Sequence, residues 1–184
     1  KAYSTLASVL TPIAKYYCSE EGHKCANLAV QIHGGAGYTE DYDVSRFFRD
    51  SRINTIYEGT SQIHVRIATG AILAGMTGEG NLKKYLNSMK EELPSPSKFL
   101  LEQSKLLEEA IHSLRSVEKE EIKERLAENL MIQTARYICS LLYERALLKI
   151  PKPSIYEIWL KDCRAYLIDS TAIAKGCLYR IQNL

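Results

Sequence analysis

A single carboxylate, Glu58, stands apart within the stretch RDSRINTIYEGTSQIH, which spans residues 49–64. It follows Tyr57 and precedes a Gly-Thr-Ser run, and no lysine or arginine is adjacent to it. One interpretation is an acid at the start of a helix, where the helix dipole favours negative charge. The other is a base, because an apolar loop with Ile56 and Tyr57 would partly desolvate the carboxylate, and desolvation raises the pKa of a carboxyl group. Both interpretations remain open.

A second chemically suggestive run is Gly34-Gly35-Ala36-Gly37. It follows a helical pattern instead of a strand and lacks the lysine of a P-loop, which argues against the usual phosphate-binding loops. Three glycines in four positions let a backbone approach a flat or tightly fitting group. A helix C-cap followed by a loose turn explains the same glycines equally well.

Two Glu-x-x-His pairs, Glu20 with His23 and Glu109 with His112, match part of a ferritin-like di-metal site. That site also needs a glutamate from each of two further helices, all pointing inward. Glu20 lies next to a glutamate, a glycine and a lysine, and His112 lies at the margin of an apolar stripe. Solvent-exposed faces are therefore the favoured interpretation, and no metal is expected.

Composition excludes several classes of function. The chain has 184 residues, of which 46% are hydrophobic, so it can bury the core of one domain or of one domain with an appended piece. Its 24 Lys and Arg are interleaved with 22 Asp and Glu, which argues against binding nucleic acid through bulk charge. No apolar run approaches the roughly 20 residues of a transmembrane helix.

The five cysteines form no C-x-x-C pair, which indicates free thiols in a reducing compartment. We therefore expect the cytoplasm, or the mitochondrial matrix in a eukaryote. The chain begins at a lysine within a helical pattern, so we expect it to be a fragment of a longer protein.

Helical periodicity dominates the first part of the chain. An N-cap at Thr11 with Pro12 in the first turn predicts the start of one helix, which should end at Gly34. The pattern predicts a loop over residues 34–43 and a short helix over 44–51. Thr60 or Ser61 should then cap a helix that runs to one of two glycines, at position 75 or 78.

The second part is also helical. Breaks at 76–82 and 92–98 are followed by three amphipathic patterns, over 99–114, 122–141 and 155–181. Ser154 and Glu157 form a capping box for the last of them. No strand alternation of useful length occurs, so the predicted fold class is all-α, with antiparallel helices joined by short loops.

Over residues 31–63 the sequence resembles the C-terminal signature of the acyl-CoA dehydrogenases. Three blocks occur in the family's order and spacing: Gln-Ile-x-Gly-Gly-x-Gly-Tyr, the Arg49-Asp50 pair, and Ile-Tyr-Glu-Gly-Thr-Ser. The resemblance implies that residues 1–77 are the latter part of that family's C-terminal helical bundle. It also implies that residues 78–184 are a second helical bundle, an extension in the layout of the very-long-chain members.

The resemblance implies a role for three residues around the carboxylate. Glu58 matches the catalytic base, which removes a proton from the carbon next to a thioester carbonyl. Tyr57 is expected to line the substrate pocket, and Gly59 to allow the backbone path beside the substrate. Arg49-Asp50 is expected to be a structural pair, since buried arginines are usually paired.

The same resemblance implies FAD as the cofactor. Thr60 and Gln62 match residues that reach the FAD diphosphate and adenosine, where helix N-terminal N–H groups suit an anion. Gln31, Gly34 and Gly35 match a segment that contacts the ADP part of FAD bound to a neighbouring subunit.

The implied function is dehydrogenation of acyl-CoA to trans-2-enoyl-CoA by the full-length protein, with this fragment alone inactive. The implied partners are an acyl-CoA substrate, an electron-transferring flavoprotein as acceptor, and further copies of the chain, with a dimer favoured. Two alternatives remain: a non-catalytic helical module for dimerisation or interaction, and the di-metal oxidase considered above.

Overall fold

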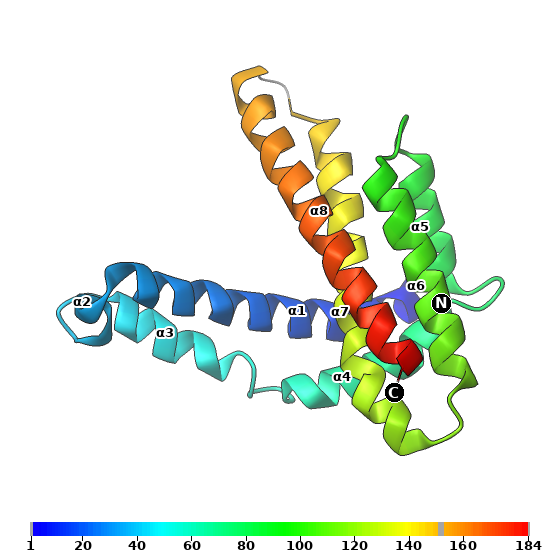
Figure 1. Cartoon of the computed structure of the whole chain (residues 1–184), viewed down its shortest axis with the longest axis horizontal. Helices are drawn as coiled ribbons and strands as arrows, with labels where there is room; N and C mark the ends of the chain where they lie inside the picture. Colours follow the sequence, from blue (N-terminus) through cyan, green and yellow to red (C-terminus); the bar gives the residue numbers. More distant parts are fainter. Residues whose placement is uncertain (1, 151–152, 184) are drawn as a thin grey trace.

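The computed structural model describes residues 2–150 and 153–183, with side chains from residue 4 onward and again from 155, and all regular structure within these ranges is helical (Figure 1). The helices in chain order are α1 (Ala2–His33), α2 (Gly35–Tyr38), α3 (Val44–Ile53), α4 (Ser61–Gly75), α5 (Asn81–Glu91), α6 (Lys98–Ser116), α7 (Glu120–Leu147) and α8 (Pro153–Asn183). The predicted all-α class is confirmed.

The first helix is longer than the sequence pattern predicts. α1 runs without interruption through Pro12, so the predicted helix start at Thr11 is wrong. Proline removes one backbone hydrogen bond from a helix interior. Val9, Ile13 and Tyr16 nevertheless lie buried on one face, on both sides of the proline, and this packing holds the helix together. The predicted end before Gly34 is confirmed.

Most of the later predicted boundaries agree with the structure to within two residues. Residues 34–43, predicted as a loop, contain the single-turn helix α2, and α7 continues six residues beyond its predicted end. α4 ends at the first of the two predicted glycines. α5, which was not predicted as a helix, begins within the first predicted break and ends just before the second. The capping box lies outside the described residues, because the side chain of Ser154 is not described.

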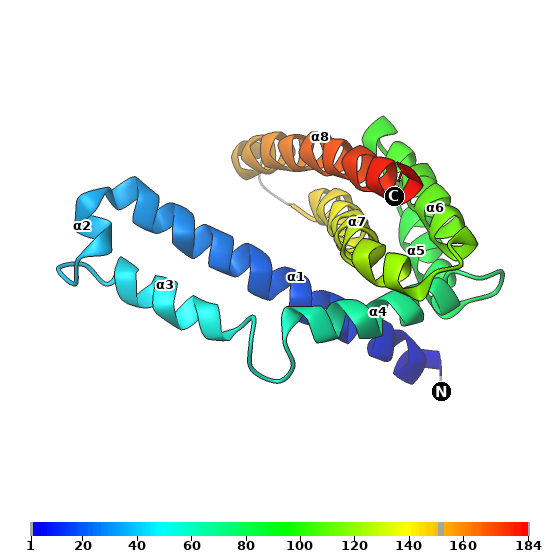
Figure 2. The same ribbon diagram turned by 60° about the horizontal axis from the view of Figure 1, so that its bottom comes forward.

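The helices form an arm and a bundle (Figures 1 and 2). α3 packs against the distal half of α1, and α4 packs against its proximal half. α6, α7 and α8 pack on one another, and α4 joins this group through α7. The loop between α3 and α4 therefore lies where the arm meets the rest of the molecule.

One continuous apolar core occupies the bundle side of the molecule. Its buried side chains come from α1, α4, α5, α6, α7 and α8, among them Ile13, Ile72, Leu82, Leu107, Leu130 and Ile181. In contrast, no side chain of residues 21–33, the distal part of α1, is buried. The division of the chain into 1–77 and 78–184 stays a prediction, and the core contains residues from both parts.

A buried amide fixes the three long C-terminal helices to one another. Gln103 on α6 donates through Nε2 to the Leu167 carbonyl (3.3 Å) and to Thr171 Oγ1 (3.1 Å), both on α8. Its Oε1 accepts from the Ser140 hydroxyl on α7 at 2.9 Å. Each polar atom of the amide thus has a partner, which specifies how the helices fit together.

Within the described ranges, no helix is both long enough and apolar enough to cross a bilayer.

The burial of side chains in the core predicts how two substitutions change the free energy of unfolding. Leu130 is fully buried on α7, so Leu130→Ala is expected to lower the free energy of unfolding by about 2–5 kcal/mol through lost burial and a residual cavity. Ile158→Ala, at a largely exposed position on α8, should change it by less than about 1 kcal/mol. Urea unfolding followed by circular dichroism measures both, and equal effects would contradict the assigned core.

Candidate functional site

The turn between α3 and α4 carries Glu58 and is held by its own backbone. The N–H groups of Ile56 and Tyr57 both donate to the Ile53 carbonyl, at 2.9 and 3.0 Å, and continue the end of α3 as a turn. The N–H of Ser61 donates to the Thr55 carbonyl at 3.1 Å, which closes the turn at the start of α4. Residues 57–60 are therefore presented by a loop with both ends fixed.

Glu58 has an unusual backbone conformation. Its φ is 54°, and among the described residues no other non-glycine has a positive φ. A left-handed conformation costs an ordinary residue about 1–2 kcal/mol. Gly59 follows with a φ of 99°, a value that favours glycine. Such strain concentrates at functional sites, because the surrounding structure must hold it in place.

The side-chain surroundings of Glu58 differ from the sequence-based expectation. Ile56 and Tyr57 are 47% and 46% exposed, and Glu58 is itself exposed, so these neighbours do not desolvate the carboxylate within this chain. Among the described residues Glu58 has no ion pair. A lysine close to the turn, Lys15, donates to the Asn54 carbonyl and lies over the Tyr57 ring, 4.7 Å from its centroid. The carboxylate is left without a permanent positive partner.

A histidine that the sequence reasoning did not single out contacts the turn. His64 Nε2 lies 3.2 Å from the Glu58 carbonyl oxygen. A Cβ at Gly59 would lie 3.1 Å from the same nitrogen, so glycine gives the ring room to approach. The signal in the sequence was the position of His64 in the first turns of α4, because helical side chains point back toward the N-terminus.

The start of α4 lies against α1. Thr60 is the N-cap by position, as predicted, but its side chain makes no capping hydrogen bond. The Ser61 hydroxyl instead donates to the Glu20 carboxylate on α1. Gln62 is exposed on the first turn.

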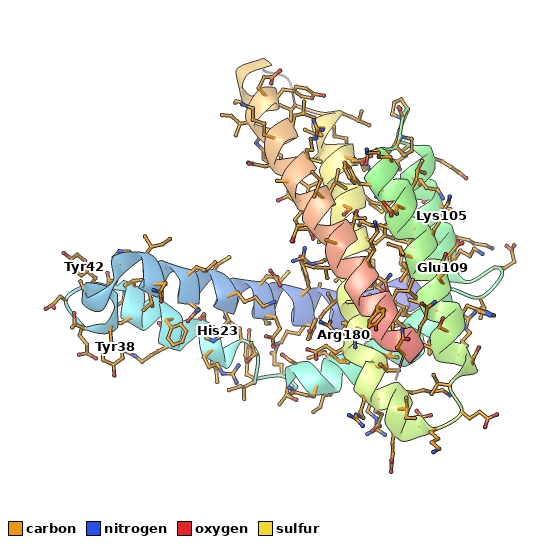
Figure 3. All side chains as sticks on the ribbon, in the orientation of Figure 1. His23, Tyr38, Tyr42, Lys105, Glu109 and Arg180 are labelled. Carbon is orange, nitrogen blue, oxygen red and sulfur yellow. The ribbon has the colours of Figure 1, made fainter. Side chains whose placement is uncertain are left out.

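The histidine of the first Glu-x-x-His pair makes structural contacts with α3. His23 Nδ1 lies 2.9 Å from the Ser51 hydroxyl, and its ring stacks on Phe48 with centroids 4.9 Å apart, both on α3. Figure 3 places His23 on the arm and Glu109 on α6, in separate parts of the molecule. No group of three or more His, Cys, Asp or Glu side chains that could hold a metal occurs among the described residues.

The glycine run forms the tip of the arm. Gly34 has a φ of 60° and reverses the chain after α1, and its carbonyl accepts from the Gly37 N–H at 3.0 Å. A Cβ at Gly37 would lie 2.6 Å from the Val30 carbonyl oxygen, so packing requires glycine there, a constraint the sequence did not reveal. A Cβ at Gly35 would meet nothing within 4 Å, and Gln31 is exposed. The backbone at Gly35 is therefore open to an approaching group.

The structure separates the predicted site residues into two groups (Figure 2). Tyr57, Glu58, Gly59, Thr60 and Gln62 lie together at the turn, whereas Gln31, Gly34 and Gly35 lie at the tip. The ten residues of α3 separate them, which is about 15 Å of helix.

The Arg49-Asp50 pair does not form. Arg49 pairs instead with Glu40 at 3.5 Å, on the exposed surface of the arm. Consecutive residues of a helix point in different directions, so Arg49 reaches the preceding loop more readily than its neighbour in α3.

A groove of about 700 Å³ borders the turn and reaches the C-terminal helices. Its walls include Gln62 on α4 and Lys123 on α7. Tyr16 on α1 donates from its hydroxyl to Glu128 Oε1 on α7 at 2.8 Å. Burial, reinforced by this carboxylate, raises the pKa of Tyr16 far above its ordinary value. This contact ties the helix that supports the site to the C-terminal part of the chain.

Comparison with known proteins finds a family match for the first part of the chain. Residues 4–73 match the family model described as "Acyl-CoA dehydrogenase, C-terminal domain". A short/branched chain specific acyl-CoA dehydrogenase of Rattus norvegicus is 51% identical over 53 residues, 29% of this chain and 12% of the relative. A caffeyl-CoA reductase-Etf complex subunit of Acetobacterium woodii is 49% identical over 61 residues, 33% of this chain and 16% of the relative. A probable acyl-CoA dehydrogenase of Bacillus subtilis is 38% identical over 99 residues, 50% of this chain and 17% of the relative.

A solved structure extends the comparison of the fold. An acyl-CoA dehydrogenase from Bacillus anthracis, complexed with FAD, superimposes with a TM-score of 0.62 at 20% identity. The match covers 94% of this chain and 36% of that chain, so the helices beyond residue 77 also have counterparts in the solved fold. Residues 4–73 therefore belong to the C-terminal domain of the acyl-CoA dehydrogenase family. The chain spans a minor fraction of the length of these relatives.

The conformation of the turn predicts the effect of a substitution that can be measured on this chain alone. Gly59→Ala is expected to destabilise it by about 1 kcal/mol or more, because alanine is strained at a φ of 99° and its Cβ crowds His64. Gly22→Ala is the matched control: a Cβ in the middle of α1 meets nothing within 4 Å, so a gain of up to about 1 kcal/mol is expected. Thermal unfolding measures the stability of both variants. A Gly59→Ala variant as stable as the wild type would contradict the strained conformation of the turn.

Proposed function

We propose that this chain is the C-terminal part of an FAD-dependent acyl-CoA dehydrogenase, and that Glu58 is its catalytic base. The observation that carries the proposal is the strained Glu58, whose carboxylate has no cationic partner among the described residues, at the Ile-Tyr-Glu-Gly-Thr-Ser turn of a family-matched region. The carboxylate removes a proton from the carbon next to the thioester carbonyl. FAD, when bound, would supply the acceptor for the hydride of the neighbouring carbon, so that the product would be a trans-2-enoyl-CoA.

The electrostatics of the turn suit a base. An ion pair would stabilise the charged form of the Glu58 carboxylate and weaken it as a proton acceptor. Lys15, the lysine close to the turn, instead contacts the Asn54 carbonyl and the Tyr57 ring. The exposed turn also leaves space for a bound thioester. Water leaves when the substrate covers the turn, and the base then operates in a less polar pocket, with Tyr57 as one wall and Gly59 beside the substrate.

The backbone of Glu58 supplies a second function. Its N–H donates to no acceptor among the described residues. This free donor, beside the carboxylate on the same residue, can bind the thioester carbonyl oxygen, where negative charge develops as the proton is removed.

The residues assigned to FAD fit parts of that group. Gln31, Gly34 and Gly35 offer an exposed amide and an open backbone at the tip of the arm, where a planar group can approach closely. Thr60 and Gln62 lie at the N-terminus of α4, whose N–H groups and dipole favour an anion such as a diphosphate. Because the two groups lie at opposite ends of α3, we propose that they serve different FAD molecules, one from a neighbouring subunit.

The relatives' names include both dehydrogenases and reductases of CoA thioesters. A base that removes this proton in one direction returns it in the other, so the same turn serves both. We propose an acyl-CoA substrate, and an electron-transferring flavoprotein as the acceptor in the full-length protein. The name of the Acetobacterium woodii relative includes such a complex.

We also propose that the chain functions in a homo-oligomer, with a dimer favoured. Large apolar side chains remain exposed on α1, α3 and α4, including Leu28, Ile32, Phe47, Ile53, Ile63 and Ile67. Contiguous exposed apolar surface marks an interaction site.

The five free thiols agree with a reducing compartment, the cytoplasm or the mitochondrial matrix of a eukaryote.

The oligomer proposal can be tested on this chain. Ile63 and Ile67 lie one turn apart on α4 and are about half exposed. We expect the wild-type chain to self-associate in light scattering at high concentration, and Ile63→Lys combined with Ile67→Lys to lower its apparent mass. Ile158→Lys on α8 is the control. A monodisperse wild-type monomer would contradict the proposal.

The catalytic proposal is tested on the full-length protein. Wild-type enzyme should carry flavin absorbance that bleaches on anaerobic addition of acyl-CoA. Glu58→Gln removes the base but keeps the size of the side chain, and should slow bleaching at least about 100-fold. Asn87→Asp, at an exposed position on α5 in the bundle, is the control and should bleach at the wild-type rate. Bleaching that survives Glu58→Gln would place the base elsewhere.

A further inference from the structure

We propose that His64 is a positioning residue, which holds Glu58 in its left-handed conformation through a hydrogen bond to the Glu58 carbonyl. This inference rests on the proposed role of Glu58 as base. It adds a residue of α4 that acts through the backbone of Glu58.

The contact assigns the hydrogen on the ring. A carbonyl oxygen can only accept, so Nε2, 3.2 Å from the Glu58 oxygen, must be the protonated nitrogen. The other nitrogen, Nδ1, is buried and has no hydrogen-bond partner in the part of the chain that the structure describes. The bond to Glu58 is therefore the one polar interaction that orients the imidazole among the described residues.

Glu58 lies between two anchors. On its N-terminal side, the Tyr57 N–H donates to the Ile53 carbonyl at the end of α3. On its C-terminal side, its own carbonyl accepts from His64 on α4. The first bond fixes the peptide group between Ile56 and Tyr57, and the second fixes the peptide group that follows Glu58. Together they limit the backbone conformations that are open to Glu58.

His64 is itself firmly placed. Its N–H donates to the Thr60 carbonyl at 3.1 Å, which puts it in the first turn of α4. The next residue, Val65, is buried against the core. Gly59 completes the arrangement, because the ring approaches the position that a Cβ would take at that residue. The histidine thus transmits the fixed position of α4 to a turn that is otherwise exposed.

The test compares two side chains of nearly equal size in the full-length holoenzyme. His64→Met removes the donor, whereas His64→Gln keeps an N–H at a similar reach. His64→Met is expected to slow anaerobic flavin reduction by acyl-CoA about three- to tenfold, the effect of one hydrogen bond. The KM for acyl-CoA should change less than kcat, and His64→Gln should restore most of the rate. His112→Met, on the exposed face of α6, is the control and should reduce at the wild-type rate.

The outcomes separate this inference from the proposed function. If Glu58→Gln bleaches at the wild-type rate, Glu58 is not the base and the premise of this inference fails. If Glu58→Gln is inactive but His64→Met reduces at the wild-type rate, or His64→Gln is as slow as His64→Met, the positioning role alone is overturned. Should His64→Met not fold, His64→Leu replaces it in the same comparison. FAD content and thermal unfolding of every variant ensure that only folded, loaded enzyme is compared.

Discussion

The packing of α4 across the proximal half of α1 is the constraint on which the rest of the structure depends. α1 contributes Val9, Ile13 and Tyr16 to the core, and α4 contributes Ala68 and Ile72. At the outer edge of this contact, Glu20 on α1 accepts from the Ser61 hydroxyl at the start of α4. The turn that carries Glu58 connects α3 to α4, so the contact between α1 and α4 determines where the turn lies.

The C-terminal helices reinforce the same helix from the other side. Tyr16 bonds to Glu128 on α7, and the hydroxyl of Tyr17 lies 2.8 Å from that of Tyr166 on α8. Two consecutive tyrosines of α1 thus each reach a helix of the C-terminal part. The helices after residue 77 therefore buttress the support of the turn, and they do so without contributing a residue to the proposed chemistry.

The sequence predicted those features that local chemistry determines. The glycine run predicted the end of α1, and the apolar periodicity predicted the three long C-terminal helices, whereas α5 was not predicted as a helix. Pro12 led to a wrong helix start because burial on both sides of it, which is a tertiary effect, outweighs the lost backbone bond. The blocks around Glu58 indicated the candidate site, but its exposure depends on which other surfaces cover it, and local pattern carries no information on that.

His64 and Gly37 show where sequence reasoning stops. Each acts through a close approach to a backbone carbonyl, that of Glu58 for His64 and that of Val30 for Gly37. Such contacts depend on the path of the chain over several residues, and neither residue type signals them. The conformation of Glu58 is similar, since glutamate has no preference for a positive φ and the surrounding turn imposes it.

The absence of buried side chains in residues 21–33 has a consequence for motion. Segments with few buried apolar contacts open locally at a lower free-energy cost than the core, on the timescales that amide hydrogen exchange reports. The protection of backbone amides from hydrogen exchange should therefore decrease along α1, from its core-facing half to its tip. Gly35 lies at the tip, where the expected amide protection is lowest. The Glu58 turn lies close to the core-facing half of α1, where it is highest. The two groups of proposed site residues thus adjoin segments of α1 that differ in local stability.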